Sequence, residues 1–343
     1  MNYLEIFTEL IEIPKSTNKY ITRLVDFDKT NPCRYKIILA VDKDENNQQC
    51  VIIQLKNGGP HSKVIINNIN TLNSIKIDMF PAEIGSELDV YYSIKLSSNT
   101  EDEIFYTFIA DIIATAKNST SDLIVLDILK RVKSWMNFFK AKNSGILNDN
   151  RQIGLFAELS LLKMLLEKNT NDLLDIILSW VGPRGQNQDF IFKNKCAFEV
   201  KCSTNNNPFE VTINNEYQLD CSDLKKLFLT TFQVKRHKNT ESSNFLTLPF
   251  IVSEIKKILS KNSSAKFEFE GLLLEVGYLA EAEVEYLKYG FQIISGPVSY
   301  EVVESFPKLA RVNLPNPVSK VEYKINLQNQ TVFPGDLFSQ IDN

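Results

Sequence analysis

Residues 189–202 alternate polar and apolar side chains in a way that predicts a β-hairpin. Successive side chains of a strand point to opposite faces, so Glu199 and Lys201 share one face. A three-residue turn at 193–195 places Asp189 directly across from Glu199, whereas a two-residue turn puts it on the wrong face. The three-residue register also gathers apolar side chains on the second face: Phe190, Phe192, Phe198 and Val200. The hydrophobic pattern therefore favours a hairpin on which Asp189, Glu199 and Lys201 converge.

Two carboxylates and a lysine on adjacent strands suit a hard cation with oxygen ligands. Mg²⁺ typically takes one or two carboxylates and keeps several waters. Such an ion acidifies a water and neutralises charge on a phosphate. Lys201 is then placed to orient that water or help deprotonate it, and to stabilise the transition state. On its own, however, a Glu-x-Lys strand is most often a solvated salt-bridge face, so the spacing leaves both interpretations open.

A helix expected over Gly154–Lys168 carries Glu158 at the centre of a leucine-rich face. The leucines that flank it at helical spacing are Leu155, Leu161, Leu162 and Leu165, and the residues expected on the opposite side are Ser160, Lys163 and Glu167. Burying a charge without compensation costs several kcal/mol, so this carboxylate needs a cation, a donor or a metal ion. A structural arginine partner is the simpler alternative to a functional role.

Composition excludes several classes of protein. The chain of 343 residues has 38 basic and 42 acidic side chains, a net charge of −4, so DNA would have to bind in a local groove. Its two histidines, His61 and His237, leave almost nothing for a His-based zinc site or a Ser-His-Asp triad. The five cysteines form no CxxC pair and are expected to be free thiols. With no apolar run near the ~18 residues of a membrane helix and no basic leader at the N-terminus, we expect a cytoplasmic protein without a membrane partner.

The chain is long enough for two domains. Short β-branched and aromatic runs separated by turn clusters predict a β-rich accessory domain over residues 1–118. Residues 119–150 are expected to form a helical linker. Residues 151–343, which contain the helix and hairpin described above, are expected to form the domain that carries the chemistry, with a C-terminal extension.

The order of a helical glutamate, Asp189 and then Glu199-Val200-Lys201 resembles the PD-(D/E)XK nuclease superfamily. More narrowly, the chain resembles a bacterial family of PD-(D/E)XK proteins associated with restriction and phage-defence loci. The stretches that carry this resemblance are Gly154–Leu159, Trp180–Pro183, Asp189–Phe190, Glu199–Lys201 and Gln218–Asp220. It is strongest over 150–225, and weaker similarity extends over most of the chain.

The resemblance implies an α/β (α+β) fold, with a restriction-endonuclease-like central mixed sheet flanked by helices. It also implies a Mg²⁺ ion, replaceable by Mn²⁺, on Asp189 and Glu199, with the Val200 carbonyl as a further ligand. Lys201 would be the catalytic lysine and Glu158 a supporting acidic residue. One departure is Gln188, which stands where the superfamily motif has proline. Another is Cys202-Ser203-Thr204 after the lysine, where the narrower family more often has small hydroxyl residues.

Other residues are candidates for a supporting role or for contacts with DNA. Gln218 resembles a glutamine that in some branches arranges the site or touches DNA, although a capping or turn role fits it equally well. Arg184 and the run Lys235–Lys238, which includes Arg236, are candidate phosphate contacts. For that run, a solvated charged strand end is the alternative.

These observations predict a Mg²⁺-dependent DNA endonuclease of the restriction or phage-defence type. One alternative is a catalytically silent nuclease-fold subunit that binds DNA or a partner protein in a defence complex. Another is a structural assembly protein. Intact Asp189, Glu199 and Lys201 favour the first, because a silent subunit has no need to keep all three. The expected partner is DNA, with other defence subunits and a second copy of the chain as further candidates.

Overall fold

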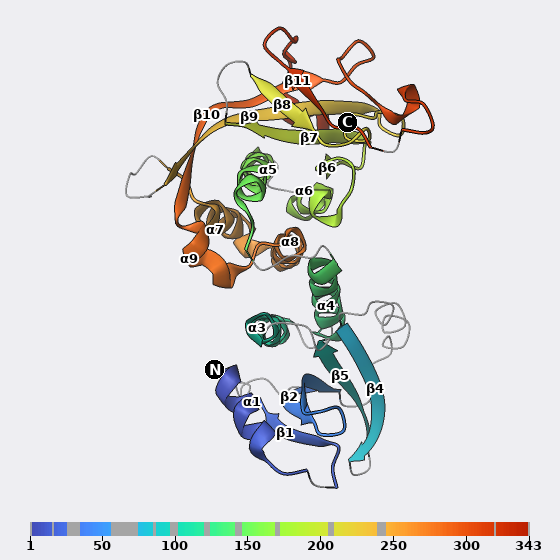
Figure 1. Ribbon diagram of the computed structural model, residues 1–343, viewed down its shortest axis with the longest axis vertical. Helices are drawn as coiled ribbons and strands as arrows, with labels where there is room; N and C mark the ends of the chain where they lie inside the picture. Colours follow the sequence, from blue (N-terminus) through green and yellow to red (C-terminus); the bar gives the residue numbers. More distant parts are fainter. Residues whose placement is uncertain are drawn as a thin grey trace. The chain divides into compact units, whose positions relative to one another are not determined.

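The computed structural model (Figure 1) describes most of the chain, in these ranges: 2–15, 17–25, 35–55, 75–84, 87–96, 102–119, 124–140, 146–168, 172–204, 209–238, 245–318 and 320–341. It divides into two compact units, 1–142 and 143–343. Helices and mixed sheets together confirm the predicted α+β class. The finer division at residues 118 and 150 stays a prediction.

The first unit contains an antiparallel sheet, in which the described strands follow the order β1-β2-β3-β5-β4. The strands are β1 (Tyr20–Leu24), β2 (Tyr35–Asp42), β3 (Gln48–Leu55), β4 (Ile75–Ile84) and β5 (Glu87–Leu96). Runs such as Ile37–Val41 and Cys50–Ile53 are β-branched or small and apolar, and they supply much of the buried part of this sheet. The β-rich character predicted for this part of the chain is therefore present.

Helices also belong to this unit: α4 lies in the expected helical linker, whereas the helices before residue 119 lie where the sequence predicts mostly strands. They are α1 (Tyr3–Glu12), α3 (Asp102–Asn118) and α4 (Ile124–Lys140). The α3 segment is rich in isoleucine and aromatic residues, which suggests strands. However, its buried side chains Phe105, Phe108, Ile109, Ile112, Ile113 and Ala116 recur every three or four residues, which is the helical period. Trp135 of α4 packs edge-on against Phe108 and donates its indole N–H to Asp111, so the two helices pack together.

The second unit is built on a mixed sheet with the strand order β10-β9-β7-β6 (Figure 1). Its strands are β6 (Phe190–Ile191), β7 (Cys196–Ser203), β9 (Lys226–Lys238) and β10 (Tyr289–Glu301). β7 and β9 run parallel, while β6 and β10 pair antiparallel with their neighbours. β7 is therefore an inner strand with a partner on each side.

Helices cover one face of this sheet and a strand pair covers the other (Figure 1). The helices are α5 (Asp149–Lys168), α6 (Leu173–Ser179), α7 (Leu248–Ile258), α8 (Ser263–Val276) and α9 (Glu283–Tyr286). The strand pair is β8 (Glu210–Ile213) with β11 (Tyr323–Asn326). Alternate residues of β7 enter the two cores, so that Phe198 and Val200 face the helices while Ala197 faces β8 and β11. This packing buries β7 on both faces.

The hairpin that joins β6 and β7 has the predicted register. Phe190 pairs with Phe198, and Ile191 pairs with Ala197. The connection is the three-residue turn 193–195, which the N–H of Phe192 closes by donating to the Cys196 carbonyl. This register places Asp189 across from Glu199. In the part of the chain that the structure describes, no helix is long and apolar enough to cross a bilayer.

Candidate active site

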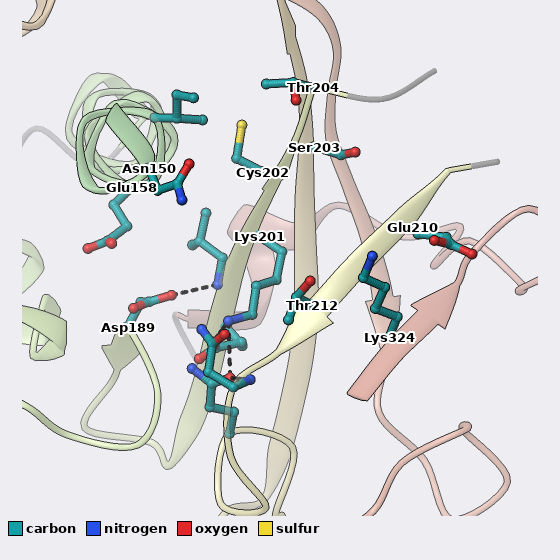
Figure 2. Close-up of a pocket in the computed structure, with 16 residues that line it drawn as sticks. Asn150, Glu158, Asp189, Lys201, Cys202, Ser203, Thr204, Glu210, Thr212 and Lys324 are labelled. Atoms are coloured by element: carbon teal, nitrogen blue, oxygen red, sulfur yellow. Dashed lines mark hydrogen bonds and ion pairs between the residues drawn. The ribbon is translucent and has the colours of Figure 1, made fainter. Parts of the chain in front are cut away.

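A polar pocket of about 490 Å³ brings together Glu158 from α5, Asp189 just before β6, and Glu199 and Lys201 from β7. Other residues that line it include Gly154, Val200, Glu210, Thr212, Gln218 and Lys324. Figure 2 shows Glu158 and Asp189 on one side of Lys201, with Thr212 and Lys324 on the other. The four residues that sequence reasoning expected to converge therefore face one pocket.

Asp189 is held by the main chain on both sides. Its carbonyl accepts hydrogen bonds from the N–H groups of Val181 and Gly182, at 2.9 and 3.0 Å. Its carboxylate Oδ2 accepts the N–H of Val200 at 2.8 Å (Figure 2). Burial raises the pKa of Asp189, while the charge of Lys201 and the Val200 N–H act in the opposite direction. The side chain is thus fixed beside β7 with its other oxygen, Oδ1, directed toward Gly182.

Glu199 is almost wholly buried, with 1% of its surface exposed. Its Oε1 forms an ion pair with Lys201 Nζ at 2.9 Å. Its Oε2 is buried and has no hydrogen-bond partner among the described residues. Burial, and then the nearby charge of Asp189, raise the pKa of Glu199 to about 8. A buried carboxylate oxygen that lacks a donor is uncommon and calls for an explanation, such as an ion.

Glu158 reaches the same pocket from α5. Its Oε2 accepts the indole N–H of Trp180 at 2.8 Å. Burial raises the pKa of Glu158 well above its usual value; the charge of Asp189 adds to this effect and the Trp180 hydrogen bond opposes it. No arginine pairs with this carboxylate in the described ranges, so the structural-arginine alternative does not hold there.

Lys201 lies between the acidic residues and the strand pair β8–β11. Its ammonium group donates to Gln218 Oε1 at 3.0 Å in addition to pairing with Glu199. Burial alone would lower the pKa of Lys201, but the charges of Glu199, Asp189 and Glu158 outweigh it and raise the pKa. Gln218 Oε1 also accepts the N–H of Asn214 at 2.8 Å. Gln218 therefore stabilises a turn and also contacts the lysine.

The donor set fits a hard cation. The charge of Asp189 raises the pKa of both Glu158 and Glu199, and the buried Oε2 of Glu199 has no donor among the described residues. Gly182 keeps the space between Asp189 and Glu158 open, since a Cβ there would lie 2.9 Å from Asp189 Oδ1 and 3.4 Å from Glu158 Oε2. Among the described residues, no three Asp, Glu, His or Cys side chains form a ready-made metal cage. These carboxylates therefore suit an ion such as Mg²⁺, which binds one or two carboxylates and keeps several water ligands.

The other predicted contacts do not line this pocket. Arg184 lies 3.5 and 3.7 Å from the carboxylates of Glu268 and Glu275. Arg236 forms bidentate hydrogen bonds to the carboxylate of Asp149, at 2.6 and 2.7 Å, and its guanidinium lies over the ring of Tyr289. Both arginines are therefore engaged within the fold. Lys235 is exposed on β9, as a solvated strand end would be.

Several residues of the site were missed by sequence reasoning. Trp180 belongs to a stretch that carries the resemblance, Trp180–Pro183, but the sequence assigned its side chain no place in the site. Gln188, which replaces the motif proline, donates its side-chain N–H to the carbonyls of Tyr217 and Gln218, at 2.9 and 3.3 Å. It thus links the Asp189 segment to the Gln218 turn. Lys324 lies more than a hundred residues from the hairpin, so no local pattern could have identified it.

Comparison with known proteins identifies a sequence family for this chain. No curated protein and no solved structure matches the chain significantly. A sequence family described as "Putative PD-(D/E)XK family member (DUF4420)" matches residues 3–328, which is most of the chain and includes the whole pocket. The resemblance seen in the sequence is thereby confirmed. The chain belongs to this PD-(D/E)XK family.

Proposed function

We propose that the chain is a metal-dependent DNA endonuclease and that the pocket around Asp189, Glu199 and Lys201 is its active site. The observation that carries the proposal is the set of carboxylates beside one lysine, with a buried oxygen of Glu199 left without a donor among the described residues. PD-(D/E)XK membership supports the same class of reaction. A restriction or phage-defence role is part of this proposal and rests on the resemblance. A cytoplasmic location is also part of it and rests on the sequence expectation given above.

In this proposal Asp189, Glu199 and the Val200 carbonyl hold a Mg²⁺ ion, and Mn²⁺ can replace it. A bound ion of this kind acidifies a water and neutralises charge on a phosphate. Glu158 adds a fourth polar group to the same side of the pocket. Lys201 is held protonated by its acidic neighbours, which favours a role as donor to the phosphate or the attacking water over a role as base. Gln218 keeps the lysine directed into the pocket.

The test is incubation of the purified chain with supercoiled plasmid, short duplexes, single strands and RNA, each with Mg²⁺, Mn²⁺ or EDTA. We expect cleavage of DNA with either metal and none in EDTA. A wild-type chain that binds DNA and cuts no substrate would point to the silent-subunit alternative. One observation favours that alternative: Lys201 and Lys324 are the only basic residues that line the described pocket. A partner subunit or a second copy of the chain would then supply further contacts with DNA.

Gly182→Ala is expected to weaken metal binding without unfolding the chain. The added methyl group would lie 2.9 Å from Asp189 Oδ1 and occupy the space between the carboxylates. Disturbing the groups around metal ligands typically costs about 10–100-fold in affinity. Gly154→Ala is the matched control, because Gly154 lines the same pocket and an added methyl group there meets nothing within 4 Å. Mn²⁺ binding, followed by the paramagnetic resonance signal of the free ion, should separate the two variants; equal affinities would contradict the expectation.

Lys324→Gln is expected to weaken DNA binding but not the chemical step. Lys324 is opposite Thr212 in the β8–β11 pair, both line the pocket, and no ion pair engages the lysine within the described ranges. Losing one phosphate contact should reduce the slope of log affinity against log salt by about 1. Lys320→Gln, an exposed lysine outside the pocket, is the control. Binding titrations in Ca²⁺ at several salt concentrations test this, and an unchanged slope would remove Lys324 from the DNA-binding surface.

A further inference from the structure

Trp180 and the two residues after it form hydrogen bonds with the carboxylate of Glu158 and with the main-chain carbonyl of Asp189. The ring of Trp180 is fully buried and packs against Phe269 of α8. Its main chain bridges Phe190 in antiparallel fashion, and the next two N–H groups donate to the Asp189 carbonyl. Its indole N–H donates to Glu158 Oε2 at 2.8 Å. One short segment thus fixes the backbone of Asp189 and the carboxylate of Glu158.

The indole bond is the only hydrogen bond that the carboxylate of Glu158 receives within the described residues. An indole N–H can donate but not accept, and a rigid ring packed in the core holds that donor in one place. A glutamate side chain has three rotatable bonds, so without this donor it could adopt other rotamers within the pocket. A phenylalanine at this position would keep most of the buried ring volume but carry no donor.

We propose that Trp180 is a positioning residue. Through its indole N–H it holds the Glu158 carboxylate toward the proposed cation site. This inference rests on the proposed function. It goes further by assigning a role to the Trp180 side chain, which acts through Glu158 and does not touch the substrate. Removing a hydrogen-bond partner of a group around a metal site typically weakens metal binding by about 10–100-fold.

The chain offers a matched control, because it contains two tryptophans and both donate to a carboxylate. Trp135 is also buried, and its indole N–H donates to Asp111 at 2.8 Å in the first unit. Trp180→Phe and Trp135→Phe therefore delete the same kind of bond at two places. We expect Mn²⁺ to bind Trp180→Phe about tenfold more weakly and Trp135→Phe as it binds the wild type. Mn²⁺ is the probe, measured by the resonance signal of the free ion.

A double-mutant cycle separates positioning from simple packing. If Trp180 acts through Glu158, adding Trp180→Phe to Glu158→Ala should cause no further loss of Mn²⁺ affinity. If Trp180→Phe fails to fold, 3-benzothienylalanine can be incorporated at position 180 in the Trp135→Phe chain. That analogue keeps the shape of the ring and replaces the N–H by sulfur, so the same tenfold weakening is expected.

Three results would overturn the inference. Unchanged Mn²⁺ affinity after loss of the indole N–H, in a wild-type chain that binds Mn²⁺ and cuts DNA, would reject Trp180 alone and leave the proposed function standing. Additive losses in the cycle would show that Trp180 acts through packing and not through Glu158. A wild-type chain that neither binds Mn²⁺ nor cuts DNA would overturn the proposed function and this inference together.

Discussion

Asp189→Asn and Glu199→Gln are each expected to abolish metal-dependent DNA cleavage, with a single-turnover rate reduced on the order of 10³-fold or more. A metal ion contributes several kcal/mol of charge stabilisation in the transition state, and each ~1.4 kcal/mol is a factor of ten in rate. Both substitutions keep the size of the side chain and one oxygen acceptor. Asparagine at 189 can still accept the Val200 N–H, so the hairpin should remain intact.

The control for this pair is Glu210→Gln. Glu210 lines the same pocket from β8 but is not part of the proposed ligand set. We expect this variant to cleave DNA at close to the wild-type rate. Circular dichroism and thermal melting of all three variants show whether the fold is kept. Wild-type cleavage by a correctly folded Asp189→Asn or Glu199→Gln would place the metal site elsewhere.

Lys201→Ala is expected to slow the chemical step by about 10²–10³-fold while metal and DNA still bind. Losing one well-placed transition-state donor commonly has this effect. Metal binding should persist, because a protonated lysine is a hydrogen-bond donor and not a metal ligand. Lys201 contacts Glu199 and Gln218 but is not itself one of the proposed ligands, so its removal deletes no group that would hold the ion. Single-turnover rates at saturating Mg²⁺, with DNA affinity measured in Ca²⁺, separate rate from binding.

Lys201→Arg is a second variant that tests the role of Lys201 in the chemical step. It keeps the positive charge but not the compact shape of the ammonium group. Because Lys201 is mostly buried between Glu199 and Gln218, the larger guanidinium should not restore the wild-type rate. An unchanged rate for Lys201→Ala would mean that the lysine serves only to balance the charge of Glu199.

Local patterns predicted the hairpin and the helical glutamate. The alternation of phenylalanines with polar residues specifies the register, because a shift of one residue would bury Glu199 and Lys201 among those rings. Glu158 was identifiable because its neighbours at helical spacing are leucines. In both cases the information lies within about twenty residues of sequence, and the β6–β7 pairing has the predicted register.

Contacts between distant segments were not predictable in this way. Helix α5 is buried on almost every side, because it packs against the sheet and against α6 and α7. Ser160, expected on its solvent side, is buried and donates to the Phe156 carbonyl. Arg236 was a candidate phosphate contact with a solvated strand end as the alternative, but it pairs with Asp149, 87 residues away. Nothing in the local sequence of either residue carries that information.

The central claim is that the pocket around Asp189, Glu199 and Lys201 hydrolyses phosphodiester bonds with a divalent metal. Its most direct test is single-turnover cleavage of a labelled duplex by the wild type, Asp189→Asn, Glu199→Gln and Lys201→Ala, purified identically, beside a DNA-binding titration in Ca²⁺. The account predicts rapid cleavage by the wild type with Mg²⁺ or Mn²⁺. It also predicts none detectable with the carboxylate variants, and slow cleavage with retained DNA binding for Lys201→Ala. Equal cleavage by all four proteins would contradict it.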